Sequence, residues 1–209
     1  MKQVLIIDDE GDLVEMLVLR LQKSGFLVDV ALDRLRTRQT PPLRILDVGT
    51  GTGCLAISLA IELEAVSIMA TDRSARAIRL AARNAEKNKV SDRISFVNTT
   101  YWAGLSGTFD AIVSNPPYLS GKDFLNLQGE VGYEPKRALD GGASGLRAYR
   151  HMIEHAPRIL RNGGFLIVEI GQAQSREVET LFEKRGFDDV RISKDFSGME
   201  RVVSARWSE

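Results

Sequence analysis

Short apolar runs alternate along the chain with longer stretches of helical periodicity. The apolar runs predict strands at residues 3–7, 44–48, 66–71, 94–97, 109–113, 164–170, 187–193 and 200–206. The periodic stretches predict helices at residues 10–23, 54–63, 74–88, 146–161 and 174–185. Strands separated by helices predict a parallel, doubly wound α/β sheet. Only a short stretch around Asp195–Gly198 separates the last two strands, so we expect a hairpin with one antiparallel strand near the C-terminus.

Two prolines fix the structure that follows the apolar run at residues 109–113. The sequence there is Asn115-Pro116-Pro117-Tyr118, and proline removes a ladder donor, so the strand ends in a stiff turn. The amide of Asn115, the carbonyl of Pro116 and the ring of Tyr118 suit holding a planar –NH2 group. The alternative is a rigid turn between strand and loop that carries no chemistry.

A glycine-rich turn joins another apolar run to a predicted helix. Residues 45–53 read Ile-Leu-Asp-Val-Gly-Thr-Gly-Thr-Gly, and Gly49, Gly51 and Gly53 allow the backbone to turn tightly and approach a ligand. The helix that follows offers free N–H groups at its start. The G-x-G-x-G spacing, with Asp47 just before it, favours S-adenosylmethionine over a pyrophosphate cofactor. Asp47 can hold the methionine amino group directly or through water.

Asp72 ends the next apolar run, 19 residues past Gly53. A carboxylate at this distance can accept both hydroxyls of a ribose. Asp72 could instead cap the helix at 74–88, a role that Ser74 could also serve. The glycine loop, this acid and the Asn-Pro-Pro-Tyr turn together predict a Rossmann-like class I methyltransferase fold that binds S-adenosylmethionine.

From about residue 27 to the end, the sequence resembles the HemK family, the glutamine methyltransferases of peptide-chain release factors. The matching stretches are residues 44–57, 112–118, 134–135 with 138–142, 163–166 with 169–171, and 195–201. The first two stretches are shared with other amino-group methyltransferases. The remaining stretches are more particular to HemK.

The resemblance implies which residues form the site. Asn115 and the Pro116 carbonyl would bind the side-chain amide of the target glutamine, with Tyr118 against its face. We therefore expect a catalytic set of Asn115, Pro116 and Tyr118 and a substrate turn of Asn115, Pro116, Pro117 and Tyr118. We expect the cofactor pocket to consist of Asp47, Gly49, Thr50, Gly51, Gly53, Asp72, Arg73, Thr100 and Asn115.

Two features depart from the family or from this chemistry. Members usually carry an acid after the third strand, near the adenine, and the aligned residue here is Thr100. His151 and His155 have the spacing of a two-histidine metal face. No third ligand is evident, so we interpret them as ordinary helix positions and expect no metal.

Composition limits the partners. The 209 residues include 28 basic and 28 acidic side chains, so no electrostatic footprint indicates binding to nucleic acid or to a membrane surface. Methylation of amino groups in nucleic acid, which also uses Asn-Pro-Pro-aromatic turns, is therefore the less favoured alternative. A single cysteine, Cys54, excludes an internal disulfide. With neither a signal peptide nor a membrane span in the sequence, we expect a cytoplasmic monomer whose partner is a release factor.

Residues 1–30 resemble a different protein, the start of a response-regulator receiver domain. Acids equivalent to Asp8 and Asp9 help bind Mg²⁺ in that family, but the phosphoacceptor strand has no counterpart here, so we expect no phosphorylation signalling. The helical recognition domain with which HemK proteins normally begin is also not recognisable. Both resemblances match across residues 27–31, so we infer a chimera that is joined there, natural or engineered, and we favour an engineered origin.

The chimera divides the chain into three expected parts. These are a receiver-like, flavodoxin-like βα fragment at 1–30, a linking helix and loop at 31–43, and a methyltransferase domain at 44–209. We favour a hybrid helix over residues 27–36, and the competing prediction is a strand at 26–30 within a β-α-β addition. The function predicted is methyl transfer to a release-factor glutamine. The alternative is a folded chimera that binds the cofactor without turnover.

Overall fold

The computed structural model describes residues 25–36, 42–121 and 140–209. Seven strands form one sheet in the order β3-β2-β1-β4-β5-β7-β6. The strands are β1 (Leu43–Val48), β2 (Val66–Asp72), β3 (Ile94–Asn98), β4 (Phe109–Ser114), β5 (Leu160–Glu169), β6 (Asp188–Lys194) and β7 (Glu200–Arg206). Strand β7 lies between β5 and β6 and is antiparallel to both, whereas the pairs among β1 to β5 are parallel. The predicted hairpin and the single reversed strand are therefore confirmed.

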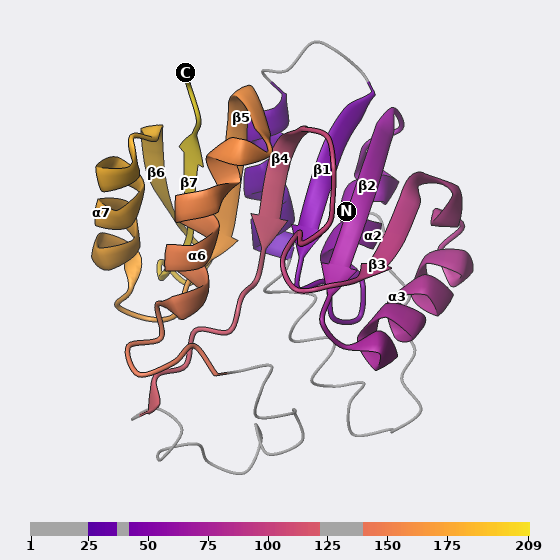
Figure 1. Ribbon diagram of the computed structural model, residues 1–209, viewed down its shortest axis with the longest axis horizontal. Helices are drawn as coiled ribbons and strands as arrows, with labels where there is room; N and C mark the ends of the chain where they lie inside the picture. Colours follow the sequence, from indigo (N-terminus) through magenta and orange to yellow (C-terminus); the bar gives the residue numbers. More distant parts are fainter. Residues whose placement is uncertain (1–24, 37–41, 122–139) are drawn as a thin grey trace.

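Helices cover both faces of this sheet (Figure 1). On one face, α2 (Cys54–Glu62), α3 (Ala75–Lys87) and a helix at residues 25–35 enclose a core with side chains such as Ile45 and Ile68. On the other, α6 (Arg147–His155) and α7 (Ser175–Arg185) pack on side chains such as Leu46 and Ile112. Successive strand residues point to opposite faces, so buried strands with apolar residues at every position produce both cores.

The helix at residues 25–35 belongs to this fold and packs on the sheet through Leu27, Ala31 and Leu35, each at most 2% exposed. The spacing of four residues places these three side chains on one helix face. The favoured prediction of a helix is therefore confirmed for the described residues. The alternative prediction of a strand at 26–30 was wrong. The predicted strand 3–7 and helix 10–23 lie outside those residues.

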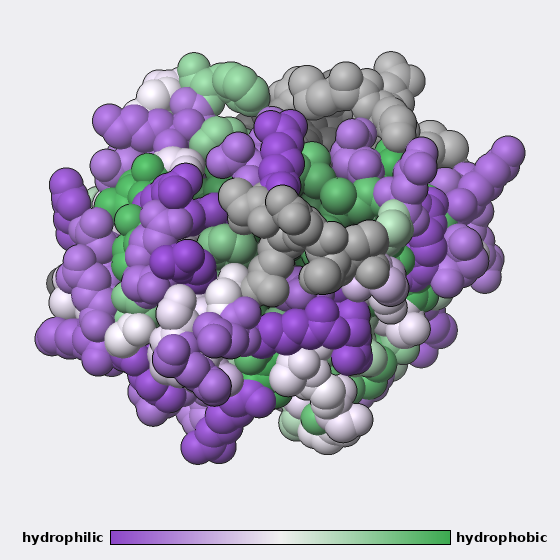
Figure 2. All heavy atoms as spheres, turned by 90° about the horizontal axis from the view of Figure 1, so that it is seen from above, coloured by the Kyte–Doolittle hydropathy of each residue, from purple (hydrophilic) through white to green (hydrophobic). Residues whose placement is uncertain are grey.

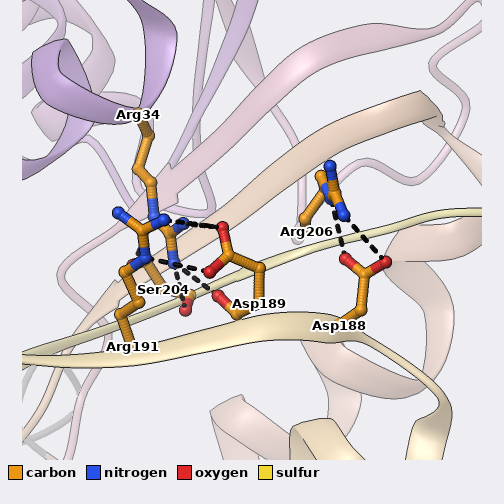
Figure 3. A network of polar contacts seen from close by, with 6 residues as sticks. All are labelled: Arg34, Asp188, Asp189, Arg191, Ser204 and Arg206. Atoms are coloured by element: carbon orange, nitrogen blue, oxygen red, sulfur yellow. Dashed lines mark hydrogen bonds and ion pairs between the residues drawn. The ribbon is translucent and has the colours of Figure 1, made fainter. Parts of the chain in front are cut away.

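A buried arginine attaches this helix to the C-terminal hairpin (Figure 3). Arg34 donates from Nε to the hydroxyl of Ser204 at 2.9 Å and from a terminal nitrogen to the Ser204 carbonyl at 3.0 Å. It also donates to the Asp189 carbonyl at 2.6 Å and forms an ion pair with the Asp189 carboxylate. An irregularity in β6 between Asp188 and Arg191 presents both oxygen groups of Asp189 to the same guanidinium.

The helix predicted at 146–161 is shorter than expected, and this boundary was wrong. Helix α6 ends at His155, a 3₁₀ turn (Ala156–Arg158) follows, and β5 begins at Leu160 rather than at residue 164. Pro157 lies at the start of the 3₁₀ turn, and proline has no N–H with which to continue an α-helix. The extra residues of β5 start its pairing at Phe109 opposite Leu160.

Viewed from above, at the amino ends of the parallel strands, the surface is mostly hydrophilic with smaller apolar patches (Figure 2). Among the described residues the one large hydrophobic side chain that is strongly exposed is Phe196, in the β6–β7 turn. Within the same residues, no helix has the length and apolar character that a membrane span requires.

Candidate functional site

The predicted site residues meet where three neighbouring strands end. Val48 of β1 lies opposite Thr71 of β2 on one side and opposite Ser114 of β4 on the other. The residues that directly follow Val48, Thr71 and Ser114 in the sequence are Gly49, Asp72 and Asn115. The chain leaves β1 for β2 on one side while β4 lies on the other, and ligands bind at such switch points in open α/β sheets. This edge lies at the lower side of Figure 1, where the arrowheads of β2 and β4 point.

The glycine loop closes through its own backbone. Gly49 and Thr50 both donate N–H groups to the Thr71 carbonyl, at 2.8 and 2.9 Å. Gly49 and Gly51 have φ values of +73° and +56°, and a Cβ added to either would meet no atom of the described residues within 4 Å. Residues that carry a side chain rarely adopt these backbone angles. Within the described part of the chain, the loop therefore bends over the end of β1 and leaves open space in front of it, as a bound ligand requires.

Gly53 has a different task from the other two glycines. It precedes α2 with φ +84°, and an added Cβ would lie 3.0 Å from the Cβ of Ala81. This glycine therefore allows α2 to pack closely on α3. Gly53 has no side chain with which to cap α2, and no residue of the first turn is acidic, so the free N–H groups at the helix start face the loop.

Asp47 lies beneath the loop and is 1% exposed. Its carboxylate accepts a hydrogen bond from the Thr50 hydroxyl at 2.6 Å and another from the backbone N–H of Ala56. Burial raises the pKa of Asp47 to about 7; the nearby charge of Asp72 raises it further, while the two hydrogen bonds lower it. In this structure Asp47 therefore joins the loop to α2. A carboxylate can accept about four hydrogen bonds, so acceptor capacity remains for an amino group.

The Asp72 carboxylate is held by two backbone donors. One oxygen accepts the N–H of Gly51 at 3.0 Å, and the other accepts the N–H of Ser74 at 2.8 Å. Ser74, not Asp72, caps α3 by accepting the N–H of Ala77 at 3.3 Å. The cap alternative for Asp72 is therefore wrong. Its carboxylate is half-buried beside the glycine loop, as a ribose-binding acid needs to be.

The Asn-Pro-Pro-Tyr turn leaves β4 at the position that the prolines predicted. The hydroxyl of Ser114 donates to the Val48 carbonyl at 2.7 Å and ties the start of the turn to β1. Pro116 is buried, and Asn115 and Tyr118 are half-buried. Among the described residues, no hydrogen bond occupies the side-chain amide of Asn115 or the Pro116 carbonyl. As far as the described residues go, both groups are therefore available to a ligand.

Sequence reasoning missed two residues that fix this turn. The side chain of Gln174 donates to the Tyr118 carbonyl at 3.0 Å, and its oxygen accepts the N–H of Gly171 at 3.0 Å. The hydroxyl of Tyr149 in α6 shares its one hydrogen between the Glu169 carbonyl, at 3.0 Å, and the same oxygen, at 3.3 Å. The available signal was a polar residue three positions after Gly171, at the start of a predicted helix.

The remaining predicted cofactor residues lie at the rim of the site. Arg73 and Thr100 are exposed, and the Thr100 carbonyl accepts the N–H of Ala103 at 3.1 Å. Tyr101, the next residue, is a further one that the sequence did not single out. Burial raises the pKa of Tyr101, while the charges of Arg147 and Arg73 lower it.

His151 and His155 stack on each other at 4.6 Å between ring centroids, and Tyr101 stacks on His151 at 4.0 Å. The Nδ1 atom of His155 lies 2.9 Å from the His151 carbonyl. The pair thus lies in an aromatic stack. In the part of the chain that the structure describes, no cluster of three metal-ligating side chains includes them.

Comparisons with known proteins agree with this geometry. The model of the methyltransferase small domain family matches residues 24–142. The release factor glutamine methyltransferase of Salmonella typhimurium is 39% identical over 183 residues, which are 87% of this chain and 65% of that protein. The same enzyme of Rhodospirillum rubrum is 42% identical over 78% of this chain and 50% of its own length. The chain thus spans about half to two thirds of the length of these relatives.

One solved structure matches this chain over nearly the full length of both proteins. The release factor-specific protein-(glutamine-N5) methyltransferase of Alicyclobacillus acidocaldarius has a TM-score of 0.55 and 31% sequence identity. The alignment covers 90% of this chain and 93% of that one. On this coverage and on the match of the family model, the chain belongs to the release factor glutamine methyltransferases, within the methyltransferase small domain family.

Proposed function

We propose that this chain transfers a methyl group from S-adenosylmethionine to the side-chain amide of a glutamine in a peptide-chain release factor. The observation that carries the proposal is the meeting of two binding elements at adjacent strand ends. The glycine loop with Asp72 follows β1 and β2, and the Asn115 turn follows β4, with Val48 opposite both neighbouring strands. The printed names of the relatives support the choice of substrate.

The residues present fit the cofactor. No described residue would lie within 4 Å of a Cβ added to Gly49 or Gly51, so a ligand can approach the backbone there. The preset carboxylate of Asp72 suits the ribose hydroxyls, and Asp47, Thr50, Gly53, Arg73, Thr100 and Asn115 complete the proposed pocket. When bound, S-adenosylmethionine supplies an electrophilic methyl group on a cationic sulfur. A pocket that excludes water favours this transfer, because the positive charge spreads from sulfur onto the amide during it.

The turn does the positioning. An amide nitrogen is a poor nucleophile, because its lone pair is delocalised into the carbonyl. The Asn115 side chain and the Pro116 carbonyl would accept both of its hydrogens, which raises electron density on nitrogen and fixes its direction. Tyr118 would lie against the amide plane, and Pro117 keeps the turn stiff. Most of the rate enhancement would come from this alignment. No strong general base is needed, because the methylated nitrogen is acidic enough to lose its proton to water.

A paired measurement tests the proposal. Calorimetry measures S-adenosylmethionine binding, and mass spectrometry of a release factor incubated with the protein and the cofactor measures transfer. We expect binding together with a gain of one methyl group on a glutamine. Binding without methylation would favour the alternative, a folded chain that binds the cofactor but does not turn over.

We also propose the chimera, with a receiver-like part at 1–30, a linking part at 31–43 and the methyltransferase domain at 44–209. Its support is the sequence of residues 1–30 and the match of both resemblances across residues 27–31. If residues 1–24 have no part in the reaction, replacing Asp8 and Asp9 by alanine leaves cofactor affinity and methylation unchanged. A loss of either would contradict this assignment. A cytoplasmic location, a monomeric state and the lack of nucleic-acid binding stay predictions from the sequence.

A further inference from the structure

We propose that Gln174 is a positioning residue that sets the substrate turn for methyl transfer. The inference rests on the proposed function, because it concerns the same turn. Gln174 belongs to a different part of the chain from the turn, 56 positions after Tyr118. Its amide nitrogen donates to the backbone carbonyl of Tyr118 at 3.0 Å, directly after the two prolines.

The side-chain oxygen of Gln174 is fixed by a backbone donor. It accepts the N–H of Gly171 at 3.0 Å. The hydroxyl of Tyr149, which is fully buried, shares its one hydrogen between the Glu169 carbonyl at 3.0 Å and this oxygen at 3.3 Å. Because the Gly171 N–H can only donate, it determines which end of the amide is oxygen, so the –NH2 end must face Tyr118. The end of β5 and helix α6 thereby set the direction of a donor aimed at the turn.

Close packing leaves this contact little freedom. A Cβ added to Gly145 would lie 2.4 Å from the Tyr118 carbonyl oxygen and 2.5 Å from the Gln174 nitrogen. A Cβ added to Gly171 would lie 2.8 Å from a ring carbon of Tyr118. Glycines at both places allow the backbone to surround the hydrogen bond and the ring. The carbonyl and the ring of Tyr118 are thus both held against the β5–α7 turn.

This arrangement matters for an amide substrate. The proposed acceptors, Asn115 and Pro116, precede Tyr118 by only two or three residues in a stiff segment. A displacement of Tyr118 therefore also moves them. Misplacement of reacting groups by about 1 Å can reduce a rate by about a hundredfold. Gln174 then acts on the rate through the turn without touching the substrate.

The substitution Gln174→Glu isolates the donor. Glutamate has the same length, keeps an oxygen for Gly171 and Tyr149, and places a second oxygen where the Tyr118 carbonyl had a donor. The matched control is Gln172→Glu, which adds the same charge two positions earlier on an exposed side chain. Each full-length variant is measured for kcat and KM with a release factor, for the Kd of S-adenosylmethionine, for its thermal midpoint, and for backbone hydrogen exchange.

For Gln174→Glu we expect kcat to fall about ten- to a hundredfold. We expect cofactor Kd and release-factor KM to stay close to those of the Gln172→Glu control, and the thermal midpoint to fall by only about 2–4 °C, because one hydrogen bond is lost. Exchange should accelerate in peptides that cover Tyr118 to Gly121 and nowhere else in the described sheet. A merely structural role would lower the thermal midpoint and leave kcat per folded molecule unchanged.

Two results would overturn the inference. One is unchanged exchange at Tyr118 to Gly121, which would show that Gln174 does not hold the turn. The other is faster exchange with unchanged kcat, which would show that the hold has no bearing on transfer. If the wild-type chain methylates no release factor, the proposed function fails, and the exchange result alone still decides whether Gln174 fixes the turn.

Discussion

The hydroxyl of Thr50 donates a hydrogen bond to the Asp47 carboxylate across 2.6 Å, within a loop that is closed at both ends. Asp47 is 1% and Thr50 is 7% exposed, so the bond is shielded from water. A buried carboxylate is costly unless donors surround it, and here the loop itself supplies one. The glycine loop is therefore held in shape by its own threonine before any cofactor binds.

Replacing Thr50 by alanine removes this donor. The Asp47 carboxylate would lose one of its two hydrogen bonds, and we expect a loss of about 1–3 kcal/mol in the free energy of unfolding. Thr50→Ser keeps the hydroxyl and is the control. Denaturant unfolding monitored by circular dichroism measures both. Equal stability of the two variants would show that the hydroxyl contributes nothing.

The pKa of Asp47 predicts a pH dependence of stability. With a folded pKa of about 7, raised from 3.8 by burial, the native state holds the proton more tightly than the unfolded chain. Stability from this group is therefore greatest at acid pH and falls as the pH rises from about 4 to about 7. The change is about 4 kcal/mol, since one pKa unit corresponds to about 1.4 kcal/mol.

The variant Asp47→Asn tests that dependence, because it cannot ionise. Other carboxylates titrate in both proteins, so the informative quantity is the difference between their unfolding free energies. We expect this difference to move in favour of Asp47→Asn as the pH rises from 5 to 8. A difference that stays constant would mean that Asp47 titrates at its ordinary pKa.

Two glycines with similar backbone angles should differ in what they tolerate. A Cβ added to Gly53 (φ +84°) would lie 3.0 Å from the Cβ of Ala81, whereas one added to Gly104 (φ +76°) would meet no described residue within 4 Å. Alanine costs backbone strain of about 1 kcal/mol or more at either position, and at Gly53 overpacking adds about 1–3 kcal/mol. Thermal unfolding of Gly53→Ala and Gly104→Ala measures the difference. Equal losses would contradict the close packing of α2 on α3.

Arg34 should matter for stability far more than its neighbour Arg36. Arg34 is 4% exposed and binds both Asp189 and Ser204, while the Arg36 side chain is 78% exposed. Arg34→Leu leaves the Asp189 carboxylate without its buried partner, and we expect a loss of about 2–4 kcal/mol. Arg36→Leu should change stability by less than about 0.5 kcal/mol. Chemical denaturation of both variants tests the expectation, which fails if their midpoints coincide.

Features encoded by local sequence were predictable. Prolines directly after an apolar run placed the substrate turn, and Asp195 with Gly198 placed the hairpin, because each signal acts on its own few residues. Local signals alone did not decide residues 26–30, where strand and helix patterns both matched. Burial of Leu27, Ala31 and Leu35 on one face decides in favour of helix. The predicted end of the helix at residue 161 was wrong, because Pro157 has no N–H with which to continue an α-helix.

Contacts between distant residues were beyond the sequence. Gln174 reaches Tyr118 across 56 positions, and Arg34 reaches Ser204 across 170. No periodicity records such a pair. The engagement of Asp47 by Thr50 was also missed, because it depends on how the loop closes. In a sequence, a carboxylate beside a glycine loop suggests ligand binding. Only the folded loop shows that a hydroxyl of the loop already donates a hydrogen bond to this carboxylate.

The most direct test of the central claim is methyl transfer to a release-factor glutamine by the wild-type chain and by Asn115→Ala. The control is Asn162→Ala, at an exposed residue near the start of β5, far from the strand ends that form the site. We expect one added methyl group with the wild-type chain and with Asn162→Ala. With Asn115→Ala we expect transfer to be at least about a hundredfold slower, the cost of losing a group that aligns the reacting atoms. Equal rates for all three proteins would contradict it.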